Sequence, residues 1–174
     1  YANGYDKNQP LIIWSMGKSI IGTVLGTLVK QTSFDIHKPA PVPEWGDLED
    51  PRHAITTDQL LRMSSGLKFV EEYSGTLVDV VLMLYGSPDT AAYPYKQVLH
   101  KIGMQRTIME MAASGTYIGS SFTYSTPRDM ARFGLFCMLD GVWNGERILP
   151  EGWIEYSTTP TAHVLKNEYE AQFW

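Results

Sequence analysis

The sequence has little of what disulfide-rich, zinc-binding, nucleic-acid-binding and membrane proteins require. Its single cysteine, Cys137, excludes an internal disulfide and a cysteine-based zinc site. Lysine and arginine number 14 against 19 acidic residues and form no cluster, which argues against nucleic acid or a charged membrane surface as a partner. No apolar run reaches the roughly 18 residues of a membrane span, so we expect no transmembrane segment.

Several common catalytic signatures are absent as well. The sequence contains no G-x-S-x-G nucleophile elbow, no H-E-x-x-H zinc helix and no glycine-rich phosphate loop. Its histidines lie apart without ligand spacing, as is typical of surface or loop positions; they are His37, His53, His100 and His163. Cys137 has phenylalanine and methionine neighbours, which indicates a buried, inert thiol. The sequence therefore predicts neither a metal ion nor a cofactor.

What is present is a globular composition, with 44% hydrophobic and 19% charged residues. The clearest periodicity covers residues 15–31, where apolar residues recur at helical spacing. Glycine costs a helix about 1 kcal/mol relative to alanine, yet this segment contains Gly17, Gly22 and Gly26. Such glycines favour close packing against another backbone. We therefore expect this helix to be central and buried.

Further helices are predicted from their caps. Residues 56–59 form a capping box, and Gly66 is the expected end of that helix. Residues 126–129 combine a threonine cap with proline at the first helical position and predict a helix to about Asp140. The remaining helical patterns cover residues 76–85, residues 95–102 and the segment after Pro150. Alternating patterns are scarce, so little sheet is expected.

The tetrad Ser15-Met16-Gly17-Lys18 is an S-x-x-K at the start of the first helix. Positions i and i+3 share a helix face, so the hydroxyl and the amine can meet. Free N–H groups and the positive dipole end of the first turn favour a developing oxyanion. A partly buried lysine can hold its neutral form there and take the serine proton. The tetrad thus predicts a nucleophile and its base.

Chance alone also produces this spacing. With 12 serines and 8 lysines in 174 residues, random placement gives about half a match. A second S-x-x-K does occur, at Ser65 and Lys68, but Gly66 between them is expected to end the helix. The alternative for Ser15 is a simple helix cap, with Lys18 as a solvated residue of the first turn.

Several segments share a pattern with one known family, in the same order along the chain. They are residues 14–19, 43–45, 55–67, 102–104, 126–134 and 141–145. Together they resemble the serine β-lactamases and penicillin-binding-protein-like hydrolases, and among these the esterase-like and 6-aminohexanoate-dimer-hydrolase-like branch. The resemblance implies an α+β fold of the β-lactamase/transpeptidase type, in which a helical domain packs against an antiparallel sheet. It also favours Ser15 and Lys18 as catalytic residues.

The implied activity is that of a serine hydrolase acting on an ester, amide or β-lactam carbonyl. Ser15 would form an acyl-enzyme with Lys18 as base, and the Ser15 backbone N–H would be one oxyanion donor. Substrate identity and oligomeric state cannot be read from the sequence. The family favours a periplasmic or secreted location slightly over a cytoplasmic one.

The sequence departs from the family where its second and third motifs are expected. No convincing Tyr-x-Asn or Tyr-x-Ser lies between residues 67 and 102, and no Lys-Thr-Gly or His-x-Gly strand follows. Tyr73 is a possible substrate or proton-relay contact, with an ordinary loop aromatic as the alternative. We expect residues 1–174 to be an incomplete β-lactamase-like domain, mostly its helical part, with residues missing before 1, near 94–95 and after 174. The alternative is a catalytically inactive β-lactamase-like binding or envelope protein.

Overall fold

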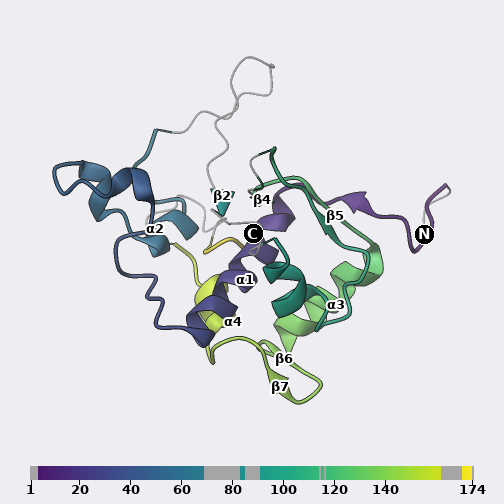
Figure 1. Cartoon of the computed structure of the whole chain (residues 1–174). Coiled ribbons are helices and arrows are strands. Elements are labelled where there is room, and N and C mark those ends of the chain that lie inside the picture. Colours follow the sequence, from purple (N-terminus) through teal and green to yellow (C-terminus); the bar gives the residue numbers. More distant parts are fainter. Residues whose placement is uncertain are drawn as a thin grey trace.

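The central element of the fold is the helix α1 (Gly17–Gln31), which directly follows a short 3-10 turn, η1 (Trp14–Met16). The computed structural model describes residues 4–68, 83–84, 91–113, 115, 117–161 and 170–173. In Figure 1, α1 lies in the middle of the molecule with the other helices and the sheet arranged around it. The helix predicted over residues 15–31 is therefore confirmed as central and buried.

The glycines of α1 allow close packing, but against side chains more than against backbone. A Cβ atom at Gly26 would lie 2.5 Å from Nε1 of Trp153. That Nε1 instead donates a hydrogen bond to the carbonyl of Gly22 at 3.2 Å. The Nε1 edge of the tryptophan indole therefore packs directly against the helix, at a place where any side chain larger than that of glycine would collide with it. Backbone neighbours are present as well, because a Cβ atom at Gly17 would lie 3.6 Å from the Gly119 carbonyl oxygen and one at Gly22 would lie 3.9 Å from the Ala171 carbonyl oxygen.

The remaining helices are short. They are η2 (Pro43–Trp45), η3 (Pro51–Ala54), α2 (Thr57–Leu61), the π-helix η5 (Tyr95–Leu99), α3 (Pro127–Met138) and α4 (Trp153–Thr158). Both predicted caps are confirmed. Thr56 and Gln59 form the reciprocal capping box, and the Thr126 hydroxyl accepts from the Asp129 N–H at 3.1 Å.

Two helix predictions were wrong. α2 ends at Leu61 rather than near Gly66, because Met63 adopts a left-handed backbone with φ of 51°. Of the helix predicted over residues 76–85, the structure describes only Met83–Leu84, and these form strand β2. The helix over residues 95–102 was correct in place, although its hydrogen bonding is that of a π-helix.

Among the described residues the strands are two or three residues long and pair antiparallel, so the sheet content of this part of the chain is low. β5 (Thr123–Ser125) lies at the centre of the main sheet, between β1 (Leu11–Ile12) and β3 (Ile108–Met109). The other pairs are β2 with β4 (Tyr117–Ile118), and β6 (Val142–Trp143) with β7 (Glu146–Arg147). Helices packed against an antiparallel sheet make this an α+β fold, as predicted.

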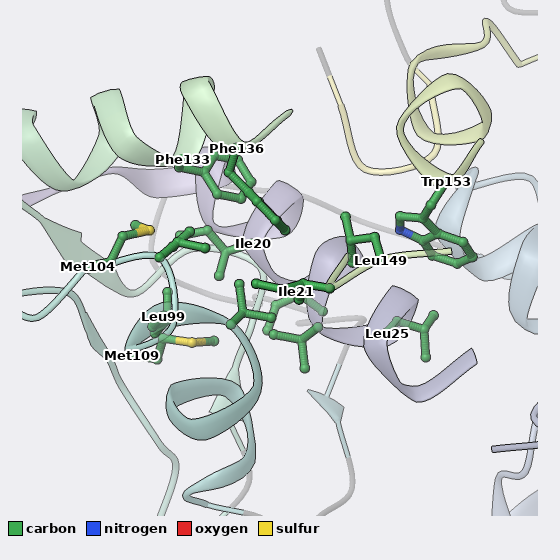
Figure 2. Packing of buried hydrophobic residues seen from close by; sticks show 14 of the residues in the cluster. Ile20, Ile21, Leu25, Leu99, Met104, Met109, Phe133, Phe136, Leu149 and Trp153 are labelled. Atoms are coloured by element: carbon green, nitrogen blue, oxygen red, sulfur yellow. The ribbon is translucent and has the colours of Figure 1, made fainter. Parts of the chain in front are cut away.

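The hydrophobic core forms around α1. Figure 2 shows Phe133 and Phe136 of α3 pointing toward Ile20 of α1. Trp153 packs against the middle of the same helix, at Gly22 and Gly26. These contacts hold the N-terminal half and the middle of α1 in the core, next to the turn that precedes it. No helix in the described part of the chain has the length and apolarity needed to cross a membrane.

Candidate active site

Ser15 lies in the tight turn that joins strand β1 to helix α1. The turn begins at Ile13, whose N–H donates to the Thr123 carbonyl of β5 at 2.9 Å. The Ile13 carbonyl then accepts from the Met16 N–H at 3.1 Å. Trp14 between them has φ of 47°, a left-handed conformation that is rare for a bulky residue. Backbone strain of this kind recurs at functional sites, where the surrounding structure holds it in place.

Ser15 and Lys18 meet as the S-x-x-K spacing requires. The Lys18 Nζ donates to the Ser15 Oγ at 2.8 Å, and both side chains are half-buried. The second S-x-x-K does not form such a pair in the structure. The Ser65 Oγ accepts from the Leu67 N–H at 3.4 Å, in a non-helical segment, and Lys68 is exposed. Only the first tetrad therefore places a serine hydroxyl against a lysine amine within the described residues.

The Ser15 hydroxyl stands directly before the N-terminus of a fifteen-residue helix. The first turn of α1 contains no acidic residue to offset the positive end of the helix dipole. Negative charge that develops on an atom near Ser15 is therefore stabilised by this end of the helix.

Strand β5 and the loop before it pack against the start of α1 at Gly17. A Cβ atom at Gly17 would lie 2.8 Å from the Thr123 Oγ1 and 3.6 Å from the Gly119 carbonyl oxygen. Thr123 is fully buried, and its Oγ1 has no hydrogen-bond partner among the described residues. A glycine at position 17 therefore lets the sheet approach the helix between the serine and the lysine.

Apolar side chains flank the serine on the solvent side. Trp14 and Met16, the two sequence neighbours of Ser15, are 58% and 51% exposed. The Trp14 ring is tilted against the Phe122 ring, with 6.3 Å between their centroids. Sequence reasoning missed Phe122 as a neighbour of Trp14, and Thr123 and Gly119 as neighbours of Gly17, because only the pairing of β5 with β1 brings them to this turn.

The candidate tyrosine, Tyr73, lies outside the described residues. Among the tyrosines that the structure describes, Tyr117 is buried, and its hydroxyl donates to the Ala91 carbonyl. Burial raises the pKa of Tyr117 to about 12, so this phenol is a donor at neutral pH. Tyr124 makes only a long contact of 3.4 Å with the Glu110 Oε2.

Other chemically capable groups have structural partners. The Asp129 carboxylate is buried and accepts from the Arg106 N–H at 2.9 Å and from Arg132 Nη1 at 2.9 Å. Cys137 is half-buried rather than buried as predicted, and its partial burial raises the pKa of the thiol to about 11. In the part of the chain that the structure describes, no group of histidine, cysteine and acidic residues could hold a metal ion.

One family model and several solved structures match this chain. The Beta-lactamase family model matches residues 2–168. A protein from Bacteroides dorei assigned as a beta-lactamase has a similar structure, with a TM-score of 0.69, 15% identity, and 90% of this chain and 58% of that chain covered. A protein from Bacillus anthracis assigned as a 6-aminohexanoate-dimer hydrolase also has a similar structure, with a TM-score of 0.69 and 19% identity. That match covers 99% of this chain and 60% of the other chain.

These structural likenesses show the fold, and the chain spans about three fifths of the length of the two solved proteins. No curated protein matches the chain significantly by sequence.

Proposed function

Because the chain belongs to the Beta-lactamase family, we propose that it is a serine hydrolase in which Ser15 is the nucleophile and Lys18 the base. One observation carries this proposal: the Lys18 Nζ lies 2.8 Å from the Ser15 Oγ, at the N-terminal end of a buried helix. A nucleophilic serine needs a base within hydrogen-bonding distance, and the helix end supplies favourable electrostatics.

The reaction begins with attack of the Ser15 Oγ on the substrate carbonyl carbon. Lys18 in its neutral form takes the hydroxyl proton as the new C–O bond forms. The carbonyl oxygen becomes an oxyanion, which the Ser15 N–H and the positive end of α1 stabilise. Collapse of this intermediate expels the alcohol or amine, which receives a proton, and leaves an acyl group on Ser15. Attack of water on the acyl-enzyme then releases the acid and restores the serine.

The proposed substrates are small molecules with an ester, amide or β-lactam carbonyl. All three present an acyl carbon to a serine nucleophile. The family and the Bacillus anthracis neighbour assigned as a 6-aminohexanoate-dimer hydrolase support this range. Tyr73 remains the proposed substrate or proton-relay contact. A periplasmic or secreted location is likewise proposed from the family alone.

Covalent labelling tests the nucleophile. The full-length protein is incubated with a fluorophosphonate probe, and the adduct is located by peptide mass spectrometry. We expect one adduct, on Ser15, that is lost in Ser15→Ala. The matched control is Ser65→Ala, which removes the serine of the other S-x-x-K and should leave labelling unchanged. An adduct that persists in Ser15→Ala would overturn the assignment.

The alternative of a catalytically inactive binding protein predicts a different result. Such a protein would give no adduct on Ser15 with the fluorophosphonate or with an activated ester, although it would remain folded. The labelling experiment therefore separates the two functions.

A further inference from the structure

The sheet beside Ser15 has one buried side and one side that solvent reaches. The residues buried on the first side are Met109, Thr123 and Ser125. Successive strand residues point to opposite sides, so Tyr124 lies on the second side, where it is half-buried. The strand register places Ile12 of β1 and Ile108 of β3 directly beside Tyr124. The second side therefore presents a row of three side chains with apolar surface.

A neighbouring row on the same side ends at the candidate nucleophile. Phe122 comes two residues before Tyr124, and its carbonyl accepts from the Glu110 N–H at 2.9 Å. The Phe122 ring contacts the Trp14 ring, with 6.3 Å between the two centroids. Trp14 directly precedes Ser15, and consecutive Cα atoms lie about 3.8 Å apart. A carbonyl carbon at the Ser15 Oγ therefore has this apolar surface within reach. We call the following side chains the outer sheet face: Ile12, Trp14, Ile108, Phe122 and Tyr124.

Trp14 gains little stability from its position. It is 58% exposed, and its backbone has φ of 47°. This left-handed conformation is unfavourable for a bulky residue, whereas glycine or asparagine adopts it readily. Ile108, on the far strand of the outer sheet face, is 55% exposed. Apolar surface that stays in water beside a nucleophile, on a strained backbone, is typical of a ligand contact rather than of packing.

The charged residues around the outer sheet face do not favour an anionic ligand. β1 and β3 both run antiparallel to β5, so Ser15 and Glu110, which follow these two strands, lie at the same end of the sheet. The Glu110 Oε2 lies 3.4 Å from the Tyr124 hydroxyl, and the Lys18 amine at this end donates to the Ser15 Oγ. Arg106 precedes β3 and lies toward the opposite end. Because the Glu110 carboxylate repels anions and the face itself carries no charge, an uncharged apolar group fits best.

We propose that the outer sheet face binds the acyl part of the substrate, and that this acyl part is an uncharged apolar chain of medium length. Three strands about 4.8 Å apart make the face about 10 Å wide, enough for an extended chain of several carbons. The acyl part is assigned to this face because it stays bonded to Ser15 through both steps of the reaction, whereas the alcohol or amine leaves after the first. The inference rests on the proposed serine hydrolase function and adds Trp14, Phe122 and Ile108 as residues that determine specificity.

Ester hydrolysis by the full-length protein tests the proposal. p-Nitrophenyl acetate and p-nitrophenyl hexanoate have the same leaving group and differ only in the acyl chain. We expect kcat/KM to be about tenfold higher for the hexanoate, because its additional methylene groups lose water against the outer sheet face. Equal values would overturn this inference and leave the serine hydrolase proposal intact. No turnover of either ester would also overturn it, and fluorophosphonate labelling of Ser15 then decides separately whether the nucleophile is correct.

A second pair of esters tests the assignment to the acyl part. Hexyl acetate and ethyl acetate carry the additional methylene groups on the leaving alcohol instead. We expect their kcat/KM values to differ by less than about threefold. A preference for hexyl acetate as large as the preference for the hexanoate would overturn the assignment.

Variants locate the contact surface. Trp14→Asn removes the ring and suits the left-handed backbone, and Ile108→Thr removes apolar surface while keeping a β-branched residue in the strand. Each should lower the ratio of hexanoate to acetate kcat/KM about threefold or more, while acetate turnover reports whether Ser15 still reacts. Met138→Gln is the matched control, because Met138 is an 84% exposed apolar residue of α3 outside the outer sheet face. It should keep the wild-type ratio. Thermal melts confirm folding, and a wild-type ratio in both folded variants, Trp14→Asn and Ile108→Thr, would overturn the proposal.

Discussion

At the scale of single residues, the Ser15–Lys18 pair depends on the glycine between its members. In Gly17→Ala the added methyl group would lie 2.8 Å from the Thr123 Oγ1 and 3.2 Å from its Cβ. Thr123 is fully buried and part of a paired strand, so it cannot move away freely. We expect a loss of about 1–3 kcal/mol in the free energy of unfolding and slower labelling of Ser15. Urea denaturation and the labelling rate measure the two effects.

Gly134→Ala provides the control for this substitution. Gly134 lies in α3, and no atom lies within 4 Å of the position that its Cβ would occupy. Alanine should therefore stabilise the protein by roughly 0.5–1 kcal/mol, through helix propensity alone. If Gly17→Ala raises the free energy of unfolding as Gly134→Ala does, then β5 does not approach the turn at Ser15 as closely as described.

The reactivity of the single thiol, that of Cys137, should depend on pH. Burial raises the pKa of Cys137 to about 11, so at pH 8 about one molecule in a thousand carries the reactive thiolate. We expect a thiol reagent such as Ellman's reagent to react slowly with the folded protein at pH 8, and rapidly in denaturant. Fast reaction of the native protein would contradict the raised pKa of this half-buried thiol.

At the scale of elements, the start of α3 is held by a buried carboxylate. Asp129 accepts from the Arg106 N–H, from Arg132 and, at 3.2 Å, from the Thr107 Oγ1. Asp129→Ala would leave the Arg106 N–H and the Thr107 hydroxyl without this acceptor in a largely buried site, whereas Arg132, which is 43% exposed, can turn to water. We expect a loss of about 3 kcal/mol in the free energy of unfolding, measured by urea denaturation.

An exposed ion pair gives the comparison for Asp129. Asp140 pairs with Arg147 at 2.9 Å, and the two side chains are 42% and 38% exposed. Solvent screens such a pair, so Asp140→Asn, which removes the charge but suits the left-handed φ of 49° at this position, should cost less than about 1 kcal/mol. Similar losses for the two variants would mean that Asp129 is not buried as described.

The elements also show how far local sequence signals extend. The caps at Thr56 and Thr126 were predicted correctly, because a cap is made by side chains within four residues of each other. The strand at Met83–Leu84 was mistaken for helix, because its state depends on pairing with the distant strand β4. α2 ends early because Met63 has a left-handed backbone conformation, and no sequence pattern predicts this conformation for a methionine.

At the scale of the whole molecule, a polar clamp joins α2 to α4. The Tyr156 hydroxyl donates to the Asp58 Oδ1 at 2.6 Å, and Arg62 donates to the Thr159 carbonyl at 3.1 Å. We expect Tyr156→Phe to cost about 1.5 kcal/mol, because it removes a hydrogen bond to a carboxylate. Tyr124→Phe is the control, because the Tyr124 hydroxyl makes only a long contact of 3.4 Å with the Glu110 Oε2. This substitution should change the free energy of unfolding by less than about 0.5 kcal/mol.

The pH dependence of this clamp follows from the tyrosine. Burial and the hydrogen bond to Asp58 raise the pKa of Tyr156 above its ordinary value. An unfolded tyrosine ionises near pH 10, so the unfolded state loses its proton first, and the contribution of the clamp is lost as pH rises further. The difference between wild type and Tyr156→Phe should be constant from about pH 7 to 9 and shrink above about pH 10. A difference that grows there would contradict this assignment.

The candidate site was only partly predictable from the sequence. Ser15 and Lys18 could be proposed because their spacing of three lets the two side chains meet on one turn. The resemblance to a known family then favoured this pair over Ser65 and Lys68, which have the same spacing. The contacts of Phe122 with Trp14 and of Thr123 with Gly17 join positions about a hundred residues apart. They arise only when β5 pairs with β1, and no local pattern encodes that pairing.

The most direct test of the proposed catalytic pair is the rate at which a fluorophosphonate modifies Ser15 in the Lys18→Met variant of the full-length protein. Methionine keeps most of the side-chain volume and removes the amine, while Lys68→Met removes the lysine of the other S-x-x-K as a control. We expect modification of Ser15 to slow by about 10²–10⁴ in Lys18→Met and to stay unchanged in Lys68→Met. Modification of Ser15 at the wild-type rate in a folded Lys18→Met variant would contradict the role of Lys18 as base.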